Sequence, residues 1–207
     1  MNLERLKQAE ADFLAQYPGG FDHPEMAALG RKHKMDKMVE LAQEGFARDK
    51  FRSPALIVEN MVKVVSRASM VSVFEKPKFR DYARALTLDE MDVLSTGLKE
   101  ILYGPEDQGF EKMLAVLKEG SIAKWPLMTI CQTYFRPDVE VFVKPTTVKG
   151  VIERFELKHL QYKPTPSWAF YAGYRDAINE MKRHVDPSLS PSNAAFSGFL
   201  MMAMEQV

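Results

Sequence analysis

Two glutamate–histidine pairs are the nearest approach to a metal-binding motif in this chain. Glu156 precedes His159 by three positions and Glu180 precedes His184 by four, so each pair would share one face of a helix. Helical di-iron proteins use the Glu-x-x-His motif twice, together with glutamates from two other helices. The motif occurs once here. A metal-dependent helical enzyme using Glu156 and His159 is therefore an alternative hypothesis, and no cofactor is predicted.

The single cysteine, Cys131, is a candidate nucleophile by residue type alone. It follows the largely apolar run 127–130, where burial would raise the pKa of a thiol and leave it inert. The sequence contains no glycine-rich phosphate loop, dinucleotide fingerprint, Gly-x-Ser-x-Gly elbow or His-Glu-x-x-His helix. These observations favour a protein that is not an enzyme.

Clusters of basic residues could bind the phosphates of a nucleic acid. Residues 144–163 carry five basic and two acidic side chains, and residues 63–81 show the same excess. The basic residues are Lys144, Lys149, Arg154, Lys158 and Lys163 in the first run, and Lys63, Arg67, Lys76, Lys78 and Arg80 in the second. Such runs are most often solvated faces. If the fold brings the two runs together, they would suit phosphate binding, and nucleic acid is the most specific candidate partner.

Several short motifs resemble those of an uncharacterised family of bacterial helical proteins. They are Phe74-Glu75-Lys76 with Phe79-Arg80-Asp81, Leu102-Tyr103-Gly104, Trp125-Pro126-Leu127, Phe142-Val143-Lys144-Pro145-Thr146 and Pro166-Ser167-Trp168. The resemblance covers residues 55–180 of the chain. Because no activity is established for that family, the resemblance implies a helical fold and transfers no catalytic residue.

The segment from Gly120 to Thr146 is also distantly similar to helix-hairpin-helix DNA glycosylases. In the alkylation-repair type, a glycine hairpin leads into a tryptophan-bearing helix, and an extended segment then delivers a catalytic Pro-Asp. Here residues 120–124 precede Trp125, and residues 141–146 follow at a similar spacing. The hairpin lacks its second glycine and Thr146 occupies the carboxylate position, so the resemblance implies DNA binding without cleavage of a glycosidic bond.

This likeness makes Trp125, Tyr134 and Thr146 a candidate pocket. The alternative interpretation is structural. Trp125 and Tyr134 would then be core aromatic residues, and Thr146 would be the N-cap of a helix that follows a proline turn.

The elements that would position these residues are almost all helices. Apolar residues recur at spacings of three and four, and helix-start signals recur at Asp22-His23-Pro24-Glu25, Ser53-Pro54, Thr87-Leu88-Asp89-Glu90 and Ser190-Pro191. Alternation appears only at residues 139–143, which predicts at most one short extended segment. We therefore predict an all-α fold of about nine helices in a single domain spanning residues 1–207.

Composition is that of a self-sufficient globular domain, with 46% hydrophobic and 27% charged residues. Basic and acidic residues balance at 28 each, so any attraction to nucleic acid must be local. One cysteine cannot form a disulfide framework, the N-terminus lacks the apolar core of a signal peptide, and no apolar run has the length of a membrane-spanning helix. We expect a cytoplasmic protein without a membrane partner.

The C-terminal segment is apolar on more sides than a free surface helix allows. Its large apolar residues are Phe196, Phe199, Leu200, Met201, Met202 and Met204. Burial in the core is one explanation, and a homodimer or another partner interface is the other. A structural or oligomerisation module built on this helix is thus a further alternative to a nucleic-acid-binding protein.

Overall fold

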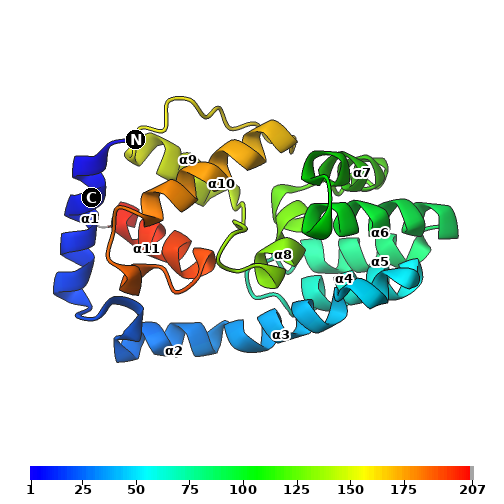
Figure 1. Cartoon of the computed structure of the whole chain (residues 1–207), viewed down its shortest axis with the longest axis horizontal. Coiled ribbons are helices and arrows are strands. Elements are labelled where there is room, and N and C mark those ends of the chain that lie inside the picture. The colour runs from blue at the N-terminus through cyan, green and yellow to red at the C-terminus, as the bar shows by residue number, and fades with distance from the viewer. Residues whose placement is uncertain (206–207) are drawn as a thin grey trace.

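The computed structural model describes residues 1–205 and shows helices without β-strands in this range (Figure 1). The α-helices are α1 (Leu3–Gln16), α2 (Pro24–Lys32), α3 (Met35–Gly45), α4 (Pro54–Arg67), α5 (Glu75–Ala85), α6 (Leu88–Tyr103), α7 (Glu106–Glu119), α8 (Trp125–Phe135), α9 (Pro145–Arg154), α10 (Trp168–Lys182) and α11 (Asn193–Glu205). Three 3-10 helices join them: η1 (Gly20–Asp22), η2 (Arg48–Arg52) and η3 (Pro187–Leu189). The all-α prediction is confirmed.

The 11 α-helices in residues 1–205 exceed the predicted number because two local features divide the chain further. Lys34 adopts a left-handed conformation with a φ of 52°, which separates α2 from α3. Helix α5 carries Pro77 at its third position, where the missing N–H costs no hydrogen bond within the helix. The segment predicted to be extended, residues 139–143, is present in part: Val139 lies in the turn after α8, and residues 140–143 form neither helix nor strand.

The helices form two groups around a shared apolar core. Helices α4 to α8 lie on one side of the molecule and α1, α9, α10 and α11 on the other, while α2 and α3 run along both (Figure 1). The main contacts join α4 to α6 and α6 to α7 in the first group, and α1 and α9 to α11 in the second. Buried side chains from both groups belong to one hydrophobic cluster.

Helix α8 is buried on nearly every side, as its apolar sequence predicts. Trp125, Cys131 and Tyr134 each have an exposed fraction of 1% or less. Burial raises the pKa of the Cys131 thiol to about 12. The prediction of a buried core cysteine is therefore confirmed.

The apolar C-terminal helix α11 packs against α1 and α9. Phe196, Phe199 and Leu200 are fully buried there, and Phe13 of α1 meets the Phe199 ring edge-on at 5.2 Å. The aromatic side chains of this helix are thus used within the chain itself. None of the helices in residues 1–205 has both the length and the apolar character needed to cross a bilayer.

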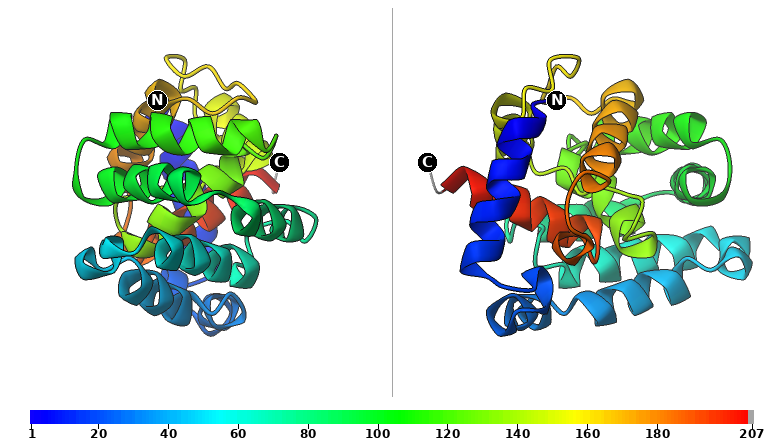
Figure 2. Two further views of the ribbon diagram at one scale, coloured as in Figure 1. Left: turned by 90° about the vertical axis from the view of Figure 1, so that its right-hand side faces the viewer. Right: turned by 60° about the vertical axis from the view of Figure 1, so that its left-hand side comes forward.

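Two glycines let α6 and α7 approach closely, and Figure 2 shows these two helices side by side. A Cβ atom on Gly109 would lie 2.5 Å from the carbonyl oxygen of Gly97 and 2.6 Å from the amide nitrogen of Ile101. Both neighbours are backbone atoms, so they cannot rotate away. The spacing of this helical hairpin therefore depends on the absence of side chains at these positions.

We predict that Gly109→Ala destabilises the protein by about 1–3 kcal/mol, the usual cost of overpacking a core. Gly30→Ala is the matched control, because a Cβ there meets no atom within 4 Å. Alanine is the better helix former, so Gly30→Ala should stabilise by about 0.5–1 kcal/mol. Urea unfolding followed by circular dichroism measures both. Equal effects of the two substitutions would contradict the proposed close approach.

Candidate nucleic-acid interface

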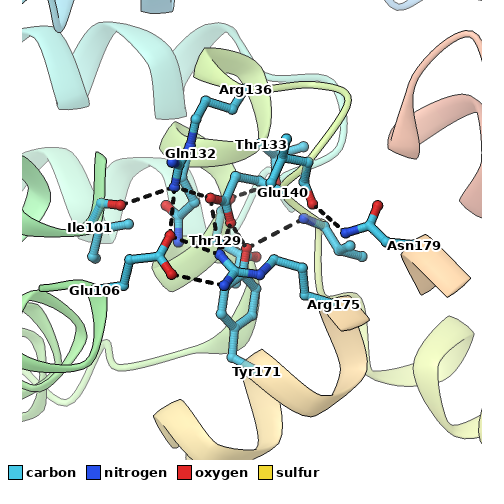
Figure 3. Close-up of polar contacts among 12 residues, drawn as sticks. Ile101, Glu106, Thr129, Gln132, Thr133, Arg136, Glu140, Tyr171, Arg175 and Asn179 are labelled. Carbon is cyan, nitrogen blue, oxygen red and sulfur yellow. Dashed lines mark hydrogen bonds and ion pairs between the residues drawn. The ribbon is translucent and has the colours of Figure 1, made fainter. Parts of the chain in front are cut away.

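The carboxylate of Glu140 has no exposed surface and lies between the two groups of helices (Figure 3). Arg136 Nη2 donates to its Oε1, and the Tyr171 hydroxyl donates to its Oε2. Arg175 Nη1 lies 3.2 Å from both oxygens. These charge-assisted hydrogen bonds offset the desolvation cost of burying the carboxylate.

A second carboxylate, that of Glu106, completes a charge-balanced network with the same two arginines. Its Oε1 accepts hydrogen bonds from Arg136 at 2.8 Å and Arg175 at 3.0 Å, and its Oε2 accepts one from Arg175 at 2.8 Å. Burial opposes ionisation of Glu106, but the hydrogen bonds from Arg175 and Arg136 outweigh it and lower its pKa. Burial and the neighbouring Glu140 raise the pKa of Tyr171, so its hydroxyl keeps the proton that it donates.

Side chains near Glu140 also hydrogen-bond the backbone of the segment 139–143. They supply the bonds that neighbouring strands would supply in a sheet. The Val141 amide donates to the Tyr171 hydroxyl at 3.3 Å, and the Val143 amide donates to Thr129 Oγ1 at 3.1 Å. Asn193 Nδ2 donates to the carbonyl of Glu140 at 3.1 Å. Side chains of α8, α10 and α11 thus provide hydrogen-bond partners for the buried backbone groups of this segment. The segment then leads directly into α9.

A helix-turn-helix made of α7, residues 120–124 and α8 presents the start of α8 at the surface. Ser121 takes the left-handed conformation of the turn, with a φ of 54°. The Ile122 amide donates to the carbonyl of Leu117 at 3.0 Å, which closes the turn. Lys124 is the N-cap residue of α8, and its side chain is exposed.

One lysine of each basic run can be linked to the start of α8, Lys163 by a hydrogen bond and Lys78 through a shared neighbour, Glu75. The Trp125 indole N–H donates to the carbonyl of Lys163 at 2.8 Å, which ties the first run to this helix. On the second run, burial raises the pKa of Glu75, while Lys124 and Lys78 are close enough to act against that shift. The first residues of α8 therefore connect segments that lie far apart in the sequence.

Four exposed lysines lie on the segments connected at the start of α8, and we call them the basic surface. They are Lys78, Lys124, Lys149 and Lys163. Lys149 Nζ lies 5.0 Å above the ring of Tyr162, in the loop that carries Lys163. In the described part of the chain, none of these lysines is within ion-pair distance of a carboxylate. Their charges remain available to an anionic partner.

Two apolar side chains project from the turn that precedes Glu75. Val73 is 70% and Phe74 is 76% exposed. The turn is ordered, since Ser72 Oγ accepts the Phe74 amide hydrogen bond at 3.2 Å and the Ser72 carbonyl accepts that of Glu75 at 3.0 Å. The turn therefore holds two exposed apolar side chains directly before Glu75.

The structure places the other predicted site residues differently. Lys144 and Lys158 are exposed, whereas Arg154 is half-buried and its Nε has no hydrogen-bond partner among the described residues. Trp125 and Tyr134 are core side chains with exposed fractions of 1% or less, and Thr146 is exposed in the first turn of α9. The N-cap of α9 is Lys144, not Thr146 as the structural interpretation expected, because the helix begins at Pro145.

The residues of the metal hypothesis have other interactions. Glu156 pairs with Arg5 at 3.3 Å and accepts a hydrogen bond from Asn2 at 3.3 Å, while His159 is exposed. His184 lies 3.0 Å from Glu180 at the surface. Within residues 1–205, no three His, Cys, Asp or Glu side chains gather in a way that could hold a metal ion.

Sequence reasoning did not find the network around Glu140. The available signal was a charged residue in the middle of the apolar stretch 139–143, four positions after Arg136. Its other members, Glu106 and Arg175, lie more than 30 positions away on either side and could not be assigned to it from local patterns. No protein-family model, curated protein or solved structure matches the chain, and the resemblances stated from the sequence remain predictions.

We predict that Glu140→Ala lowers the free energy of unfolding by about 3–5 kcal/mol, because it removes the fully buried partner and leaves two arginines to share Glu106. Glu59→Ala removes an exposed pair with Arg84 and should cost about 0–1 kcal/mol. Chemical denaturation compares the two variants. A cost for Glu140→Ala as small as that of Glu59→Ala would show that the network is not essential to the fold.

The depressed pKa of Glu106 makes its contribution to stability depend on pH. The contribution is fully present above the usual carboxyl pKa of 4.5 and is lost as the pH falls through the lower value in the folded protein. The stability difference between the wild type and Glu106→Gln should therefore shrink as the pH is lowered below 4.5. Denaturation at a series of pH values tests this, with Asp107→Asn as the neighbouring control. A difference that does not vary with pH would contradict it.

Proposed function

We propose that the protein is a non-enzymatic binding protein whose partner is a nucleic acid, held through the basic surface. The observation that supports this most directly is the link between the start of α8 and one lysine from each basic run. One run is joined to α8 by the Trp125–Lys163 hydrogen bond, and the other by the proximity of Lys124 to Glu75. An anionic polymer can then contact several lysines at once, although the chain as a whole has no net charge.

The chemistry of this surface suits phosphate contacts better than catalysis. Four lysines without acidic partners can each replace a condensed counterion on the nucleic-acid backbone. Phe74 and Val73 add an apolar contact for sugars or base edges. Glu75, the carboxylate near Lys124 and Lys78, is half-buried, so the lysines are the more exposed charges of this surface.

Lys144, Arg154 and Lys158 extend the proposed contact area along α9 and the loop that follows it. Lys144 and Lys158 are exposed and can reach further phosphates, whereas the half-burial of Arg154 limits its reach. The affinity is expected to be modest and independent of base sequence, because phosphate contacts position a protein on nucleic acid without reading bases.

The test combines mobility shift with salt titration on an unrelated 20-mer, both as a duplex and as a single strand. Changing Lys124, Lys149 and Lys163 together to Ala should weaken binding to both forms and flatten the plot of log K against log salt by roughly 0.7–0.9 per lysine. The control variant changes Lys32, Lys37 and Lys50 to Ala, because these exposed lysines on other elements give the same loss of charge. Absence of binding at low salt, or equal weakening by the control, would contradict the proposal.

A further inference from the structure

A cavity of about 550 Å³ opens where η2, the α6–α7 turn, the end of α8 and the start of α10 meet. Two aromatic rings, Tyr103 and Trp168, line it together with the charged residues Arg48, Glu106, Asp107 and Arg136. Both rings are half-buried, so each presents part of its surface to the cavity. The size falls in the range of small-molecule sites.

Both rings are fixed before any ligand arrives. The Arg175 guanidinium lies 5.4 Å from the centroid of the Trp168 ring, and the Phe110 ring lies 5.9 Å from it. The Tyr103 hydroxyl donates to the carbonyl of Phe46 at 2.8 Å, and Arg48 stacks over the Tyr103 ring at 4.3 Å. A planar ligand would therefore meet prearranged π surfaces and would not have to order them.

The charges in the cavity favour an uncharged planar ring over a phosphate. Glu106 is neutralised by Arg136 and Arg175. The remaining lining charges, Arg48 and Asp107, are opposite in sign and have no ion pair among the described residues. They give one donor group and one acceptor group, which is what the edge of a nucleobase requires.

The wall of the cavity and the start of α8 share one buried aromatic cluster. Phe110 lies 6.3 Å from the Trp125 ring, at the start of α8, and 5.9 Å from the Trp168 ring, in the cavity wall. Trp168 also follows Lys163 by only five positions, so a strand bound at Lys163 has a short path to the cavity. Lysines beside an aromatic wall are the arrangement by which proteins hold single strands.

We propose that this cavity receives an unstacked base of a single-stranded nucleic acid, with Trp168 as the stacking platform and Arg48 and Asp107 at the edge of the base. The inference rests on the proposed function and makes it more specific. A duplex keeps its bases stacked and paired, so it can use the lysines but not the cavity. Single strands should therefore depend on Trp168, and duplexes should not.

The chain itself carries a fluorescent probe of this site. It has two tryptophans, and Trp125 is 1% exposed, so a ligand that quenches emission by stacking must act on Trp168. Titration with a single-stranded 12-mer should quench the emission as the strand binds. Inorganic polyphosphate should displace a labelled 12-mer by competing for the lysines, without causing quenching.

Substitution of Trp168 provides the second arm of the experiment. Trp168→Leu should weaken binding of the 12-mer by about 5- to 150-fold, the range expected for the loss of one base–aromatic stack, and leave duplex binding unchanged. Trp168→Phe keeps a ring and should retain most of the affinity. Phe21→Leu changes a half-buried aromatic residue outside this cavity and is the control. Circular dichroism of each variant verifies the fold.

The outcomes separate this inference from the proposed function. If the 12-mer binds without quenching and Trp168→Leu binds it as well as the wild type, the base cavity is overturned while nucleic-acid binding stands. If Trp168→Leu weakens duplex and single strand equally, the cavity is again overturned, because the ring then acts only through the fold. If neither form binds at low salt, the proposed function fails and the inference fails with it.

Discussion

The buried carboxylate of Glu140 is the constraint on which the rest of this structure depends. A charge with no exposed surface is tolerated only if its hydrogen-bonding capacity is filled. Here the donors come from Arg136 at the end of α8 and from Tyr171 and Arg175 on α10. Meeting that requirement fixes the relative positions of α8, α10 and the segment 139–143, which belong to different parts of the chain.

This single requirement also explains how a helical protein accommodates an extended buried segment. Strands normally satisfy their backbone through neighbouring strands, but the described residues contain none. Tyr171 serves twice, since its hydroxyl donates to Glu140 and accepts from the Val141 amide. The network therefore stabilises both the Glu140 carboxylate and the backbone of the segment that carries it. The direction of α9, and so the position of Lys149, follows from where this segment ends.

Local chemistry in the sequence was sufficient to predict most of the helices, because their starts depend on residues close together in the chain. The capping box of Thr87 and Glu90 is present as expected, and so is the proline start of α4 at Pro54. Helix α5 was not predicted, since Pro77 resembles a helix breaker unless its position in the first turn is known.

The site was predictable only in part, for a different physical reason. The basic runs are visible as composition, but their meeting at the start of α8 depends on a contact between Trp125 and Lys163, 38 positions apart. The Glu140 network spans 69 positions, from Glu106 to Arg175, and no local pattern encodes such pairing. Trp125 was recognised as a significant residue, yet its buried ring acts as an anchor for the loop and is not open to a ligand.

One groove of the molecule is lined by acidic side chains and by no basic one. A groove of about 680 Å³ between α2, α3 and the start of α11 is lined by Asp36, Glu40, Glu44 and Asp138. The first three lie four residues apart on α3, so they form a stripe along one side of that helix. None of the four carboxylates has an ion pair in the described part of the chain.

This acidic groove restricts how a nucleic acid can approach. Helices α2 and α3 lie along one edge of the molecule, whereas α9 and the loop after it lie along the opposite edge (Figure 1). Under the proposed function, phosphates would be repelled from the groove and attracted to the lysines near the second edge, and at physiological salt each effect extends about 8 Å from the charges. In the proposed complex, a strand bound at Lys149 and Lys163 would lie away from this groove. That orientation comes from the placement of charges on a neutral chain, without any contact that reads sequence.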